Sequence, residues 1–242
     1  MGITCYLCEF CQLTGRLIPR FPARHEVPEF TVFASLLRMA TKYDLSNVRD
    51  QLIKDIKGAY PTKREAYEAG EVLGEDVFGS PTPHPNAVLN LFLEQSVRIA
   101  LPFAFYRASV GGFSAIVSDK PGTVLPRHVL ATTINGMHLV GGFMNNIARL
   151  ILYEIDLGVC DDGECVLSAA IIPVEQRVEA LRKLREMFLA KRDGGELGPL
   201  SLGHLTCAEC TTFIQASYVG GRSLCWERLP GMFSVAQSWD DV

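Results

Sequence analysis

The sequence predicts a mostly α-helical protein, and three observations support that fold class. Apolar residues recur at spacings of three and four in several segments, which is the period of an amphipathic helix. Glycine and proline residues gather between these segments, as they do in loops. Stretches that alternate between apolar and polar residues are scarce. The composition, 48% hydrophobic and 21% charged over 242 residues, is typical of a globular chain.

The helical pattern begins near Phe30, after an N-terminal segment, residues 1–28, that has no sustained periodicity. We expect this segment to be poorly structured. The first helix places five apolar residues on one face: Phe33, Leu36, Leu37, Ala40 and Tyr43. Asp44 is the expected N-cap of the second helix, which Pro61 ends. The second helix also has an apolar face: Leu45, Val48, Leu52, Ile56 and Ala59. Together they predict a helical hairpin.

Further helices are expected between residues 62 and 109. Thr62 and Glu65 have the spacing of a capping box and predict a helix over Thr62–Leu73. Residues 74–86 are rich in glycine and proline and predict a loop. A helix is predicted over 86–98, and the apolar run 101–109 begins another one, with Pro102 at a permitted early position.

The C-terminal half predicts longer elements. An amphipathic segment runs from about residue 126 to 157, weakened by three glycines. Residues 175–192 predict the clearest helix, followed by a loop over 193–203. The apolar stripe of that helix is Val178, Leu181, Leu184 and Phe188. In residues 211–230 we expect two short helices, broken at Gly220 and Gly221.

Charge and hydropathy exclude several classes of protein. The net charge of −4 gives no overall attraction to nucleic acid or to an anionic membrane. No apolar run approaches the roughly 20 residues that a membrane-spanning helix needs. The first residues lack a basic start, and Glu9 interrupts their apolar stretch, so they make a poor signal peptide. We therefore expect an intracellular protein, cytoplasmic or nuclear, whose eight cysteines stay reduced unless they bind metal.

No catalytic residues and no cofactor-binding site are predicted. The phosphate-binding, dinucleotide-binding and metalloprotease motifs do not occur in the sequence. Ser114 follows two glycines in GGFSA, but the strand-to-helix context of a nucleophile elbow is missing. The five histidines are scattered, and none has an evident partner by spacing. We expect that the protein is not an enzyme.

Four cysteines in the C-terminal half form two closely spaced pairs. Cys160 and Cys165 lie in VCDDGEC, and Cys207 and Cys210 lie in TCAEC. Four thiolates at such spacings suit a structural zinc ion, which would connect the two ends of the segment between the pairs. The alternative interpretation is that these cysteines stay reduced and pack as small apolar side chains. A thioredoxin-type redox pair is disfavoured because no βαβ pattern surrounds TCAEC.

Three stretches together resemble the BTB/POZ-domain proteins that are abundant in mushroom-forming fungi. LLRMATKYDLSNVRDQLIKDIKGAYP (36–61) resembles the closing helical hairpin of a BTB domain. AVLNLFLEQSVRIALPFAFYRAS (87–109) is similar to the helical extension that follows it. Residues 207–239, with CAEC and GGRSLCWERLP, resemble the family's tail. Few residues precede the hairpin, so most of the N-terminal BTB core is absent from the resemblance.

The resemblance implies a helical bundle or array, built from the closing hairpin of a BTB domain and a helical C-terminal extension. It divides the chain into residues 1–28, the BTB-like closing helices over 29–73, and the extension with its paired cysteines over 74–242. The implied function is that of an adaptor that binds protein partners, without a small-molecule substrate, nucleic acid or membrane. BTB-type homodimerisation is not expected, because the front of that domain is missing.

A second function class stays open. A zinc-stabilised regulatory protein that binds nucleic acid would need a basic face with interleaved aromatic residues. The helix over 177–192 is the candidate for that face, and its charges are of both signs. We therefore favour the adaptor.

Overall fold

The computed structural model describes residues 29–68, 78, 82–156 and 208–242. Helices make up 76% of these residues, and no strand occurs among them, which confirms the mostly α-helical class. In chain order the longer helices are α2 (Phe30–Lys42), α3 (Ser46–Ala59), α6 (Pro85–Glu94), α7 (Leu101–Val110), α9 (Arg127–Asp156) and α11 (Ala208–Met232). Short helices are α4 (Arg64–Glu68), η1 (Arg98–Ala100), α8 (Phe113–Ile116) and η2 (Trp239–Asp241).

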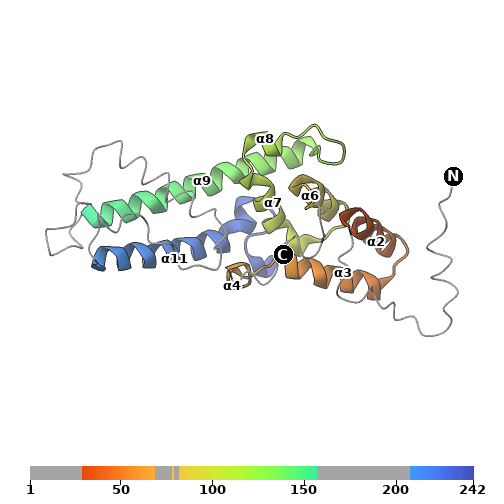
Figure 1. Cartoon of the computed structure of the whole chain (residues 1–242), viewed down its shortest axis with the longest axis horizontal. Coiled ribbons are helices and arrows are strands. Elements are labelled where there is room, and N and C mark those ends of the chain that lie inside the picture. The colour runs from red at the N-terminus through yellow and green to blue at the C-terminus, as the bar shows by residue number, and fades with distance from the viewer. Residues whose placement is uncertain (1–28, 69–77, 79–81, 157–207) are drawn as a thin grey trace.

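The molecule is elongated, with a helical body at one end and an arm at the other (Figure 1). Helices α9 and α11 lie side by side in opposite directions and form the arm. The body contains the α2–α3 hairpin, α6 and α7. Among the described residues, no helix has the length and apolar character that crossing a membrane requires.

Helix α7 is the centre of the hydrophobic core. Eight of its ten residues are buried, and it packs against α6, α9 and α11. Around it, one cluster of buried residues extends from Phe33 on α2 to Phe233 just after α11. The cluster therefore includes residues on both sides of the boundary that was predicted between 29–73 and 74–242. The division of the chain into these domains stays a prediction.

The hairpin forms as the pattern predicts, but its turn is built differently. Phe33, Leu37 and Leu52 are buried at the expected positions. Asp44 does not cap α3: its backbone is left-handed, with φ 52°, and the N-cap is Leu45, which makes no side-chain cap bond. The Leu45 N–H donates to the Ala40 carbonyl at 2.8 Å, which is the bond that closes a Schellman motif. Asp44 thus ends α2 instead of starting α3.

Two other boundaries differ from the prediction. The helix predicted over 86–98 ends at Glu94, because Ser96 is left-handed (φ 55°) and the Val97 N–H bonds to the Phe92 carbonyl. Of the helix predicted over Thr62–Leu73, the structure describes α4, and residues 69–73 lie outside the described residues. The predicted 175–192 helix lies outside them as well.

The prediction of two short helices broken at Gly220 and Gly221 is wrong. Helix α11 runs without interruption from Ala208 to Met232. Each glycine inside a helix costs about 1 kcal/mol relative to alanine, so the pair costs about 2 kcal/mol, and the packing of α11 along α9 outweighs that cost.

Proline 230 lies inside the last turn of α11 and cannot donate a hydrogen bond to the carbonyl of Trp226, four residues earlier. That carbonyl accepts a hydrogen bond from the Trp239 indole Nε1 at 2.8 Å. The two indole rings stack, with centroids 5.8 Å apart. The chain after α11 therefore replaces the bond that Pro230 removes, and it is held against the helix by the same contact.

Candidate functional site

The predicted zinc ligands fall mostly outside the part of the chain that the structure describes. Cys160, Cys165 and Cys207 lie outside it, and for Cys210 the structure places the backbone in the first turn of α11. In the described residues, no three His, Cys, Asp or Glu side chains gather as a metal site. The four-thiolate zinc site stays a prediction.

The cysteine that the structure describes fully is Cys225, on α11. It is buried, and burial raises the pKa of its thiol to about 12, so the thiol is neutral at physiological pH. Its neighbour Trp226 is buried as well, and both residues belong to the hydrophobic core. Ser114 of GGFSA is exposed on the four-residue helix α8.

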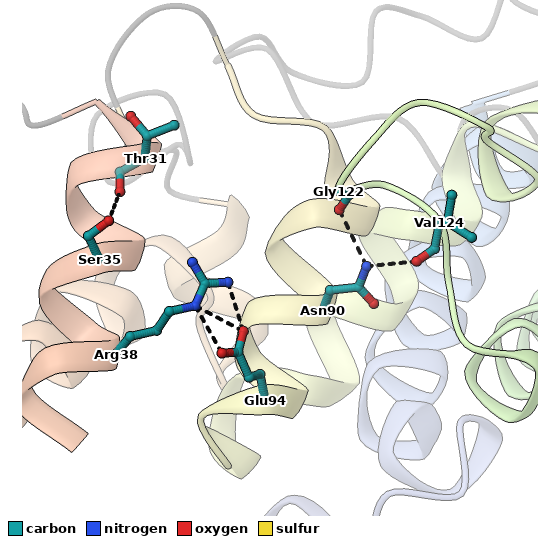
Figure 2. Close-up of polar contacts among 7 residues, drawn as sticks. All are labelled: Thr31, Ser35, Arg38, Asn90, Glu94, Gly122 and Val124. Atoms are coloured by element: carbon teal, nitrogen blue, oxygen red, sulfur yellow. Dashed lines mark hydrogen bonds and ion pairs between the residues drawn. The ribbon is translucent and has the colours of Figure 1, made fainter. Parts of the chain in front are cut away.

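Asparagine 86 holds the end of α8 and the loop after it against α6. Its side chain is fully buried, and its Nδ2 donates to the carbonyls of Ala115, Ile116 and Thr123 at 3.2, 3.0 and 3.1 Å. Asn90, one turn further along α6, donates to the Gly122 and Val124 carbonyls at 3.4 and 3.0 Å (Figure 2). Two amides on one face of α6 therefore fix the backbone of residues 115–124.

An ion pair connects the C-terminal end of α6 to α2. Arg38 on α2 reaches Glu94 through Nε and Nη2, with Nη2 2.7 Å from Oε2 (Figure 2). This hydrogen bond lowers the pKa of Glu94. Both side chains are about half exposed, so solvent screens the pair and its contribution to stability is about 1 kcal/mol or less.

Four large apolar side chains of residues 110–124 are exposed, and we call this set the α8 surface. Val110 at the end of α7 is 46% exposed, Phe113 on α8 60%, Val117 50% and Val124 57%. Ile116 in this segment and Leu125 directly after it are buried and anchor it. Val117 and Val124 of the α8 surface therefore lie on the backbone that the two asparagines hold, and Phe113 lies on α8, whose Ala115 and Ile116 carbonyls are held by Asn86.

A second feature is a small cavity bounded by α4, α7, α9 and α11. Two arginines line it, Arg64 and Arg222, together with Tyr67, Tyr106 and Trp226. The indole Nε1 of Trp226 donates to the Thr62 carbonyl at 2.9 Å, which connects α11 to the chain before α4. The sequence did not predict this cavity, because its lining residues share no local motif and those on α4 and α11 lie more than 150 positions apart.

Comparisons of the chain with protein-family models, curated proteins and solved structures found no match. The likeness to BTB-domain proteins stays a prediction, and the geometry above is the basis for the proposals that follow.

Proposed function

We propose that this chain is a non-catalytic adaptor, and that a protein partner presenting apolar side chains binds the α8 surface. The observation that carries this proposal is the exposure of Phe113, Val117 and Val124 within one segment. Exposed groups of large apolar side chains are typical of interaction sites. An aromatic residue such as Phe113 is also the kind of side chain that supplies much of the binding energy when a partner covers it.

The fixed backbone supports the same proposal. A segment held by Asn86 and Asn90 loses little conformational freedom when a partner binds, so less of the contact energy is offset by ordering. The segment carries one acidic and one basic side chain, Asp119 and Lys120, so its charges of opposite sign give no net attraction to nucleic acid. Binding through apolar contacts is expected to be insensitive to salt.

The experiment is capture of partners from an extract of the source cells by the purified full-length chain, at about 0.1 and 0.5 M salt. The test variant is Phe113→Ser/Val117→Ser, and the control is Val32→Ser, which changes an apolar residue of similar exposure on α2. We expect the same partner to bind the parent and the control at both salt concentrations, and to be lost from the double variant.

Equal binding by the double variant would refute the role of the α8 surface. The nucleic-acid alternative has its own outcome in a parallel titration with a random-sequence duplex. Binding to the duplex that falls steeply with salt, without a salt-resistant protein partner, would favour that alternative.

A further inference from the structure

One side of the arm displays large apolar side chains. On α9, Leu139 is 46% exposed and Leu150 is 60% exposed. The two residues lie eleven positions apart, which is close to three full helical turns, so both side chains point to the same side of the helix.

Helix α11 contributes to the same side of the arm. Phe143 comes one turn after Leu139 on α9 and is partly buried. The guanidinium of Arg228 on α11 lies over the Phe143 ring, 5.2 Å from the centroid. Leu224, one turn before Arg228 and therefore closer to the free end of the arm, is 39% exposed. We call Leu139, Phe143, Leu150 and Leu224 the arm face.

The chain that connects α9 to α11 starts and ends at the free end of the arm, because the two helices run in opposite directions (Figure 1). It contains the helix that the sequence predicts over 175–192, which lies outside the described residues. The stretches 157–174 and 193–207, on either side of this predicted helix, can each extend over roughly 50 Å. Leu139 lies only about 26 Å along α9 from the free end. The connecting chain is therefore long enough to reach every part of the arm face.

We propose that the predicted helix over 175–192 packs its apolar stripe on the arm face, so that the arm is a unit of three helices. The stripe and the face match in length, since each extends over about 15 Å along its helix. An amphipathic helix of this length is only marginally stable in water by itself, and it becomes stable by burying its apolar side against other helices. The residues of the stripe are Val178, Leu181, Leu184 and Phe188.

The covalent connection favours the chain's own segment over a second copy of the protein as the occupant of the arm face. A segment joined to its binding surface by a flexible linker has an effective concentration of the order of millimolar. A second copy in a dilute solution is present at about micromolar concentration, so it would need a much higher affinity to cover the face. The arm face shares no residue with the α8 surface, so the binding of a partner there is a separate question.

Hydrogen exchange measured by mass spectrometry tests this packing in the full-length protein. The test variant is Leu139→Ala/Leu150→Ala, which removes apolar groups of the arm face and keeps two good helix-forming residues in α9. The control is Val32→Ala, which shortens an apolar side chain of similar exposure, 49%, on α2. Peptides from α7 report whether each protein is folded, because α7 is the centre of the core.

We expect amides of residues 175–192 to be protected from exchange in the parent and in Val32→Ala. In Leu139→Ala/Leu150→Ala their protection should fall about tenfold or more, while the protection of α7 stays the same. This result should not depend on protein concentration between about 1 and 50 µM, since a contact within one chain is not affected by dilution.

Three results would overturn the proposal. The first is a lack of protection of residues 175–192 in the parent, and the second is equal protection of these residues in the parent and in the double variant. The third is a protein whose mass in light scattering is that of a dimer, and in which the protection of 175–192 falls on dilution. That result would assign the arm face to a second copy of the chain.

Discussion

Replacing Asn86 by aspartate tests whether the buried amide holds residues 115–124. The substitution keeps the shape of the side chain but replaces its NH₂ group by a second oxygen. In the parent protein this NH₂ group faces three backbone carbonyls at 3.0 to 3.2 Å, and the residue is fully buried. The new carboxylate would face these carbonyls without a donor between them.

The cost follows from burial and from the loss of donors. An uncompensated buried charge destabilises a protein by about 3–5 kcal/mol, and the three carbonyls also lose their partner. For a chain of this size, 1 kcal/mol corresponds to roughly 2–4 °C in Tm. We therefore expect Asn86→Asp to lower Tm at pH 7 by roughly 6–20 °C, measured by circular dichroism during thermal unfolding.

Asn90→Asp is the matched control. Asn90 makes the same kind of bond to the same segment one helical turn away, but its bonds to Gly122 and Val124 are exposed to solvent. Water can hydrate the carboxylate of this variant, so the expected loss is about 1 kcal/mol or less. If the two variants melt within about 2 °C of each other at pH 7, the Asn86 amide is not buried against three carbonyls and our reasoning is wrong.

The pH dependence of Asn86→Asp adds a second check. Burial raises the pKa of the new carboxyl group above its unfolded value, which is about 4. The unfolded state then loses its proton first, so the deficit is smallest below about pH 4 and grows as the pH rises toward the folded pKa. A deficit that does not change between pH 4 and pH 7 would contradict a buried carboxyl group.

Three further predictions concern other parts of the chain. Gly136→Ala would place a methyl group against the Phe233 ring and is expected to destabilise the protein by about 1–3 kcal/mol. Its control is Gly142→Ala on the same helix, where the new methyl group has no atom within 4 Å and should stabilise the protein by about 0.5–1 kcal/mol. Equal Tm shifts of the two variants would contradict the packing of Phe233 on α9. His84 caps α6 through Nδ1, which accepts from the Asn86 N–H at 3.2 Å, and burial, with a smaller effect of Lys120, lowers its pKa from 6.5. The stabilisation by the His84 cap is therefore present above about pH 6.5 and is lost as the pH falls through the lower folded pKa. His84→Asn keeps a capping side chain that does not titrate, so Tm should change less between pH 5 and pH 7.5 than in the parent protein. An equal change of Tm with pH in both proteins would show that another group titrates. The zinc hypothesis for Cys160, Cys165, Cys207 and Cys210 predicts about one zinc per purified, reduced chain, lost in Cys207→Ser/Cys210→Ser, and equal metal content in the two proteins would refute it.

The period of the apolar residues was enough to predict the helices but not where they end. Asp44, Ser96 and Ser234 are the three non-glycine residues with left-handed backbone among those described, and each follows a helix. In all three cases the next N–H bonds to a carbonyl five residues earlier. Sequence analysis expects glycine at this position, because glycine has no penalty there. At Asp44 and Ser96 the Schellman motif forms although the left-handed residue is not glycine. The helices on either side of each turn pack together, and this packing outweighs the cost of the left-handed backbone.

The end of α11 shows why local sequence rules fail where long-range contacts replace local ones. Gly220, Gly221 and Pro230 each predict that a helix stops, yet α11 passes through all three. Tyr218 before the glycines, and Cys225 and Leu229 after them, are buried, so the packing surface of the helix continues on both sides of the pair. At Pro230 the compensation comes from Trp239, whose indole reaches the carbonyl that the proline leaves without its helical donor. The same packing forms the cavity beside α4, because only a continuous α11 brings Arg222 and Trp226 to that helix. A variant such as Trp239→Phe, which keeps an aromatic ring but removes the N–H, should therefore weaken the end of α11 and lower the Tm of the protein, and an unchanged Tm would contradict this role of the indole.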